Sequence, residues 1–201
     1  MSRIARAALL LVPLLAACHA TRTPVLWRDP KYEGQMKKLV VAVAVEGTMR
    51  SAAEDAFVSN MPKGVEAVQS YQLQITPDMA KDREAVRARL VALAQEGYEG
   101  ALVARIADSV MTETSHIAPV GTQTMYDYWG YAWTSYTMGV QTDVHTTLIV
   151  ETRLFDLRTE RAVWAAATEA YDQKRSVDAV RKIVDEISAR LASAKIIGAP
   201  K

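Results

Sequence analysis

The sequence is poor in the side chains that most often carry chemistry. It has one cysteine, Cys18, and three histidines among 201 residues. A single thiol cannot form a disulfide within the chain, so the fold must be stable without an internal disulfide bond. The histidines, His19, His116 and His145, lack the spacing at which two of them bind zinc from one helix. We therefore expect no disulfide, no metal and no other cofactor.

Recognised catalytic motifs are also missing. The sequence contains no nucleophile-elbow, Walker-type or dinucleotide-binding glycine pattern. Serines are present, but none stands in a context that would activate its hydroxyl. We predict that the protein is not an enzyme, and a periplasmic hydrolase with a dispersed site is the alternative hypothesis.

Basic and acidic side chains are nearly equal in number. Lysine and arginine total 24 against 23 acidic side chains, which gives a formal net charge of +1. Proteins that bind nucleic acid usually carry a basic excess or a basic stripe. We therefore predict no nucleic-acid partner.

The first 18 residues have the layout of a secretory signal. Arg3 and Arg6 precede an apolar run from Ala7 to Ala17, and Leu15-Ala16-Ala17-Cys18 ends it. The run is too short for a membrane span, which needs about 20 residues. The last four residues resemble a bacterial lipobox, which implies a signal peptide at 1–17 and lipidation of Cys18. An ordinary secretory signal that happens to end near a cysteine is the alternative.

A lipidated Cys18 would fix the protein to a membrane. Two or three acyl chains, such as palmitate, on one cysteine make the attachment effectively permanent, because each buried methylene contributes about 0.8 kcal/mol. Residue 19 is histidine and not the aspartate that resembles an inner-membrane retention signal. We expect the anchor in the inner leaflet of the outer membrane and the domain in the periplasm. Removal of residues 1–17 leaves 22 basic and 23 acidic side chains.

Residues 18–36 are predicted to be the lipidated cysteine and a tether. Pro24, Pro30 and Gly34 interrupt a segment that has no helical or alternating period. Trp27 and Tyr32 are unusual in a pure linker. We expect this end to fold back and pack on the domain, and a partner contact is the alternative.

Residues 37–195 are predicted to form one domain, followed by a frayed tail at 196–201. Its class is an α/β (α+β) sandwich with a mixed sheet of about five strands and about three helices, in the order β-α-β-α-β-β-β-α. The strand at 144–154 alternates, which places Glu151 and Arg153 on its polar face. Expected strands are 39–45, 65–68, 100–107, 144–154 and 162–168, and expected helices are about 49–60, 83–96 and 176–193.

An aromatic group lies in residues 109–142, between the third and fourth predicted strands. We predict a long hairpin here, because a structureless loop of this length is uncommon in a compact domain. Three interpretations of the rings are open: they cover the domain's own sheet, they form a protein-partner or self-association surface, or they contact a glycan or lipid headgroup. The candidates for partner binding are Tyr126, Tyr128, Trp129, Tyr131, Trp133 and Tyr136.

Three segments carry a family resemblance that covers about residues 37–193. They are the 39–45 strand, the Phe155-Asp156-Leu157-Arg158-Thr159-Glu160-Arg161-Ala162-Val163-Trp164 hairpin and the 176–193 helix. This pattern resembles small bacterial lipoproteins of unknown function. Their domain is similar to that of the curli-secretion lipoprotein, of the outer-membrane activators of peptidoglycan synthases and of the N-terminal part of the Tol–Pal translocation protein. The resemblance implies an assembly or protein-binding role in the cell envelope and transfers no catalytic residue.

Overall fold

A strand of continuous apolar sequence lies in the interior of the sheet, as its composition predicts. Leu39 to Val45 are all buried, because helices cover both faces of this strand. The computed structural model describes residues 21–45, 47–107, 124–137, 147–171 and 177–198. The six-stranded sheet that it shows is mixed, as predicted, with one strand more than expected.

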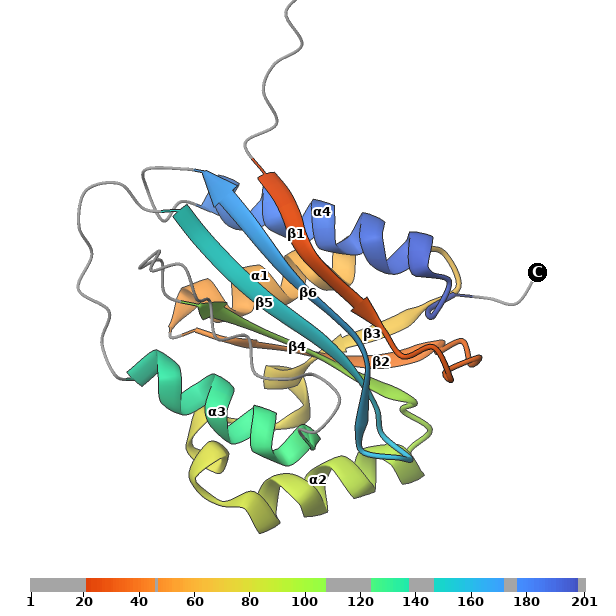
Figure 1. Cartoon of the computed structure of the whole chain (residues 1–201). Coiled ribbons are helices and arrows are strands. Elements are labelled where there is room, and N and C mark those ends of the chain that lie inside the picture. The colour runs from red at the N-terminus through yellow and green to blue at the C-terminus, as the bar shows by residue number, and fades with distance from the viewer. Residues whose placement is uncertain (1–20, 46, 108–123, 138–146, 172–176, 199–201) are drawn as a thin grey trace, which may run out of the picture.

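The strand order across the sheet is β1-β6-β5-β4-β2-β3 (Figure 1). β2 pairs in parallel with β3 and with β4, and the remaining neighbours are antiparallel. The strands are β1 (Thr21–Arg28), β2 (Lys38–Ala44), β3 (Glu66–Gln69), β4 (Gly100–Ala107), β5 (Thr147–Asp156) and β6 (Arg161–Tyr171).

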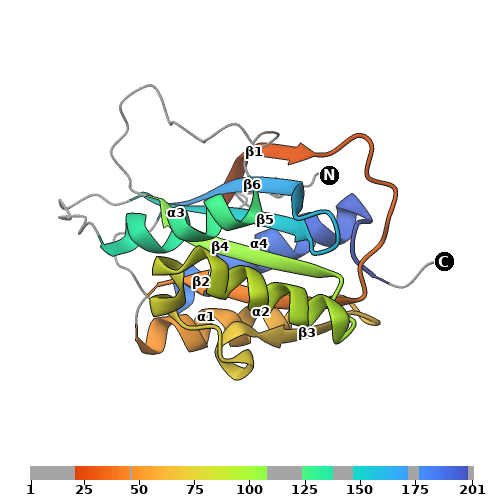
Figure 2. The same ribbon diagram turned by 90° about the horizontal axis from the view of Figure 1, so that it is seen from below.

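Two helices cover each face of the sheet and enclose two separate cores (Figures 1 and 2). α1 (Thr48–Ser59) and α4 (Val177–Ala194) lie on one face, and α2 (Arg83–Gln95) and α3 (Met125–Thr137) lie on the other. Two short 3₁₀ helices, Ser70–Leu73 and Pro77–Lys81, precede α2. The domain is thus an α/β sandwich, as predicted, with four α-helices where about three were expected.

Local sequence signals set the bounds of the helices. On α4, which matches the helix predicted at 176–193, the buried residues Ile183, Val184, Ile187 and Leu191 form an apolar stripe, while Asp185 is exposed. Asp82 caps α2, since its Oδ1 accepts hydrogen bonds from the amides of Glu84 and Ala85, both at 3.0 Å. Gly97, with φ of 87°, follows the end of α2 in the left-handed region that favours glycine. None of the described helices is long and apolar enough to cross a membrane.

The ordered structure extends beyond the bounds 37–195 at both ends. Thr21–Arg28, within the predicted tether, is strand β1, which pairs antiparallel with β6 at one edge of the sheet. Its register shifts between Arg22 and Val25, where Pro24 has no amide hydrogen to donate. Ile196 and Ile197, predicted to lie in a frayed tail, are buried, and Met36 pairs with Ile197 in an isolated bridge. Trp27 packs against the α2–α3 core, as expected for an end that folds back.

The predicted aromatic hairpin is wrong for the residues that the structure describes there, because they form helix α3. The buried residues of α3 recur at intervals of three and four, which is the spacing of one helical face. They are Met125, Tyr128, Trp129, Ala132 and Trp133, together with Tyr126 beside them. Thr124 precedes the helix, and its Oγ1 accepts a hydrogen bond of 3.3 Å from the Asp127 amide.

Candidate functional site

The aromatic candidates of α3 lie largely inside the domain. Relative exposure is 6% for Tyr126, 0% for Tyr128, 1% for Trp129 and 4% for Trp133. These four rings are buried in the domain's own core, as in the first of the three interpretations that the sequence left open. The side chains of Tyr131 and Tyr136 lie outside the described residues.

Beneath α3, the sheet carries a buried group of charged side chains from neighbouring strands. Arg105 of β4 stands opposite Glu151 of β5, and Arg153 follows on the same face of β5. The Arg105 guanidinium holds one oxygen of Glu151, with Nε at 2.8 Å and Nη2 at 2.7 Å from Oε2. Glu151 and Arg153 were predicted to lie on a polar strand face, but both are buried, as is Arg105.

Tyr128 connects this charged group to α3. The Arg153 guanidinium lies 4.1 Å from the centre of the Tyr128 ring, a distance typical of cation–π contact. Burial, followed by the Glu151 carboxylate, raises the pKa of Tyr128 well above its usual value, although Arg153 and Arg105 oppose the shift. The shift favours the protonated, neutral form of this phenol.

The chemistry of this group favours a structural role. Glu151 is enclosed and already engaged by Arg105, so it is poorly placed to take a proton from a substrate. An ion pair with little solvent contact instead fixes how two strands and their covering helix fit together. We name Arg105, Glu151, Arg153 and Tyr128 the buried charge cluster.

A second buried carboxylate joins α1 to the C-terminal end of β2. The Glu54 side chain accepts hydrogen bonds from the Val43 amide at 3.0 Å, from Arg50 Nε at 3.0 Å and from Ser70 Oγ at 2.7 Å. Arg50 also donates to the carbonyl of Ile75 and lies 5.2 Å from the Trp133 ring centre. Because these groups already occupy its carboxylate, Glu54 holds α1, β2 and the first 3₁₀ helix together and is poorly placed for catalysis.

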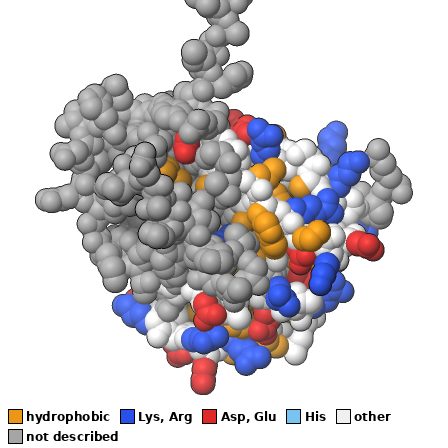
Figure 3. All heavy atoms as spheres, viewed as in Figure 1, with side chains coloured by type: hydrophobic (Ala, Val, Ile, Leu, Met, Phe, Trp, Pro, Cys, Tyr) orange, Lys and Arg blue, Asp and Glu red, His pale blue; other side chains and the backbone are white. Residues whose placement is uncertain are grey.

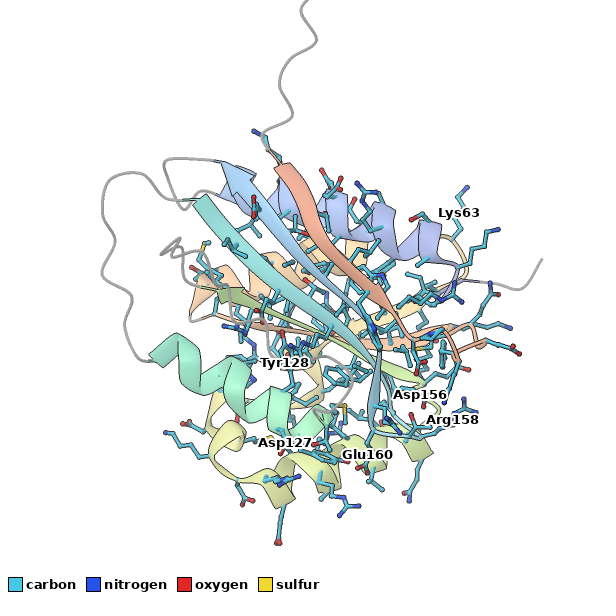
Figure 4. The ribbon with its side chains drawn as sticks, in the orientation of Figure 1. Lys63, Asp127, Tyr128, Asp156, Arg158 and Glu160 are labelled. Atoms are coloured by element: carbon cyan, nitrogen blue, oxygen red, sulfur yellow. The ribbon has the colours of Figure 1, made fainter. Side chains whose placement is uncertain are left out.

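α2 makes charged contacts with the exposed side of α3 and with the β5–β6 turn. Figure 4 shows Tyr128 on the sheet side of α3 and Asp127 on the side of α2. Arg83 of α2 contacts Asp127 at 3.2 Å, and Arg87 contacts Glu160 at 3.7 Å. Partial burial, and then hydrogen bonding to Glu160, raises the pKa of Tyr126 to about 12. Surface ion pairs of this kind contribute about 1 kcal/mol or less each.

The β5–β6 turn has a similar polar arrangement. Asp156 Oδ1 accepts a hydrogen bond of 2.8 Å from the Arg158 amide and one of 3.2 Å from the Thr159 amide. The Arg158 guanidinium returns to the other oxygen of Asp156 at 3.2 Å, and this contact raises the pKa of Arg158. Figure 4 shows Asp156 and Arg158 together at this turn. Asp156 at the start of the turn therefore fixes its shape by accepting these three hydrogen bonds.

On the face of the sheet opposite α2 and α3, α1 and the start of α4 line an open groove of about 320 Å³. Its volume is near the lower end of the range for ligand pockets, about 300–1,000 Å³. Beneath it lies a smaller hollow of about 30 Å³ lined mainly by apolar side chains, and Met49 and Val180 line both. The groove is lined by Met49, Ala52, Asp55, Ala56, Ser59, Asn60, Val180 and Arg181. We call it the α1–α4 groove.

The groove combines an apolar lining with charges of both signs. Asp55 accepts hydrogen bonds from Tyr71 at 2.7 Å and from Gln69 at 2.8 Å, and Arg181 lies on an exposed position of α4. Within the described residues, no group of three or more histidine, cysteine, aspartate or glutamate side chains could hold a metal. Cys18, His19, His116 and His145 lie outside the described residues. The groove thus combines apolar side chains with one carboxylate and one guanidinium.

Sequence reasoning missed both the buried charge cluster and the groove. An alternating strand indicates which residues share a face, but it does not show whether a distant helix covers that face. The groove is formed by two helices that are far apart in the chain, so no local pattern marks it. The helical spacing of Met125, Tyr128, Trp129, Ala132 and Trp133 is a signal that could have identified α3.

Comparison with known proteins gives little similarity in sequence. No protein-family model matches the chain, and no curated protein matches it. Among solved structures, it is similar to the PelC dodecamer from Paraburkholderia phytofirmans, with 14% identity and a TM-score of 0.44 over 85% of this chain and 96% of that chain. A substituted PelC dodecamer from the same organism gives 13% identity and a TM-score of 0.42 over 84% of this chain and 94% of that one. At these TM-scores we draw no conclusion on fold or function from the two structures.

Proposed function

We propose that the protein is a lipoprotein of the outer membrane whose periplasmic domain binds another envelope protein. The observation that carries the proposal is the Leu15-Ala16-Ala17-Cys18 lipobox, which is followed after two residues by the ordered domain. A lipid on Cys18 would hold the domain at the membrane surface, where envelope proteins are its neighbours. The family resemblance of the sequence supports an assembly role in the same compartment.

The α1–α4 groove is the binding surface that the geometry supports best. Its volume accommodates one large side chain of a partner, and Met49, Ala52, Ala56 and Val180 supply apolar contacts. Asp55 and Arg181 also line the groove, so they suit polar residues of the partner that flank its large apolar side chain. A protein segment with one large apolar residue between polar ones fits this lining, and such central anchors carry most of the energy of interfaces.

The anchor is tested by replacing the lipidated residue. Cys18→Ala is expected to move the mature domain from the membrane fraction to the soluble periplasm, or to leave the precursor unprocessed, because the acyl chains then have no thiol to modify. Fractionation and intact mass would measure this. A Cys18→Ala protein that is processed normally and still sediments with outer membrane would show that the lipobox interpretation is wrong.

The groove is tested by filling it. Ala52 is exposed on α1 and lines the groove, so Ala52→Trp is expected to block a partner while leaving the fold intact. If the groove is a hot spot, the loss is about 2 kcal/mol or more in binding, seen as a large drop in crosslinked partner yield. Ala88→Trp, at an exposed position of α2 on the other face, is the matched control. Equal yields from both variants with equal melting temperatures would exclude the groove.

A further inference from the structure

The first described strand begins almost at the anchor residue. β1 starts at Thr21, three residues after Cys18, although the sequence predicts a tether up to residue 36. A fully extended chain spans about 3.3–3.6 Å per residue, so Thr21 can lie only about 10 Å from the Cys18 backbone. A lipidated Cys18 therefore leaves very little freedom between the bilayer and this end of the sheet.

The strand pairing shows which parts of the domain share that end. Thr21 pairs with Ala170 near the end of β6, and Tyr171 pairs with Thr147 at the start of β5. α4 begins at Val177, a few residues after β6 ends. Figure 1 shows the starts of β1 and β5, the tip of β6 and the first turn of α4 close together where the N-terminal trace enters.

From this end, β1 and α4 run side by side in the same direction. Thr23 Oγ1 donates a hydrogen bond of 3.1 Å to Glu186 Oε1, and Arg28 Nη1 donates one of 2.7 Å to the carbonyl of Ala194. The later residues of both elements are therefore further from the anchored end. The β5–β6 turn, which begins at Asp156, also lies at the opposite end of the sheet from Thr147.

The described residues expose few large apolar side chains that could contact a bilayer. Among the described residues, the exposed large apolar side chains are Leu26, Tyr71 and Val91, which belong to β1, the first 3₁₀ helix and α2. They do not share one element, and the face in Figure 3 mixes apolar side chains with charges of both signs in its described part. A bilayer-binding face needs a contiguous apolar or basic surface. Within the part of the chain that the structure describes, the short connection to Cys18 is the main constraint on how the domain lies.

We propose that the end formed by the starts of β1, β5 and α4 and the tip of β6 faces the lipid headgroups. β1 and α4 then point away from the membrane and present the β5–β6 turn and the end of α4 to the periplasm. The inference rests on the proposed lipidation of Cys18, and it adds the orientation in which the bound domain meets its partners.

The test uses the fact that Cys18 is the only cysteine. Once Cys18 is acylated, a second cysteine provides the only reactive thiol for a fluorophore. Lys182→Cys and Ser193→Cys form a matched pair, because both positions are exposed on α4 and lie about 16 Å apart along its axis at 1.5 Å per residue. The full-length lipidated variants would be reconstituted in phosphatidylethanolamine–phosphatidylglycerol vesicles that contain a headgroup-labelled quencher lipid.

We expect quenching at position 182 to be at least about twofold stronger than at position 193, given the separation along the helix. A six-residue glycine–serine spacer after Ala20 should reduce the difference, since such a linker adds about 13 Å of flexible reach. Equal or reversed quenching in a protein that carries lipid and floats with the vesicles would overturn the orientation alone. A purified protein without acyl mass would overturn the anchor proposal and the orientation with it.

Discussion

Glu151→Leu is expected to destabilise the domain by about 3–5 kcal/mol, because it breaks a buried ion pair by removing one of its two partners. Both side chains are almost fully enclosed, and Arg105 holds Glu151 Oε2 through two nitrogens at 2.8 and 2.7 Å. Breaking an enclosed pair costs far more than breaking one at the surface, since water cannot replace the missing partner. Urea denaturation of the variant would measure the loss in free energy of unfolding.

The double variant Arg105→Met with Glu151→Leu is the informative control. Replacing both members of a buried ion pair by apolar residues of similar size is often close to neutral. We therefore expect the double variant to be more stable than Glu151→Leu alone. Strictly additive losses would mean that each side chain acts independently, which would contradict the proposed pairing within the buried charge cluster.

Trp129→Ala is expected to cost about 3–5 kcal/mol of stability, as for other buried aromatic residues truncated to alanine. The Trp129 ring is 1% exposed, and its centroid lies 6.2 Å from that of Trp133, so its removal opens a cavity between α3 and the sheet. Thermal melting and denaturant titration would both report the loss.

Asp127→Ala serves as the control for Trp129→Ala on the same helix. Asp127 is exposed and contacts Arg83 at the surface, so its loss is expected to cost about 1 kcal/mol or less. If Trp129→Ala melts like Asp127→Ala and the wild type, the ring does not pack as described. If Trp129→Ala instead loses crosslinked partners and keeps its stability, the aromatic segment is a partner-binding surface.

Much of the fold could be predicted because its signals are local. β2 is apolar throughout since helices cover both of its faces, and α4 presents the stripe through Val184, Ile187 and Leu191. The α2 helix begins at its Asp82 cap and ends before Gly97. Such patterns can be recognised from residues that are close together in the sequence.

The rest depends on residues that are distant in the sequence. β1 is short of apolar alternation, contains Pro24 and pairs only with β6 near the other end of the chain, so it was predicted as a tether. The stripe of α3 is obscured by Tyr126 and Tyr131, which add aromatic residues between its positions. Glu151 and Arg153 follow the polar face of an alternating strand, and their burial depends on parts of the chain that are distant in sequence, such as Tyr128 of α3 over Arg153.

The pairing of β1 with β6 also bears on how the chain reaches its native state. β1 can join the sheet only when β6, which is synthesised much later in the chain, is available. Met36 closes against the last residues as well, since its amide donates to the Ile196 carbonyl at 2.8 Å and its carbonyl accepts from the Gly198 amide at 3.0 Å. Contacts of such long sequence separation slow folding, because the loop-closure entropy is lost before they form. A chain whose synthesis has not yet reached β6 therefore has β1 unpaired, and a truncation before Arg161 is expected to leave it unpaired.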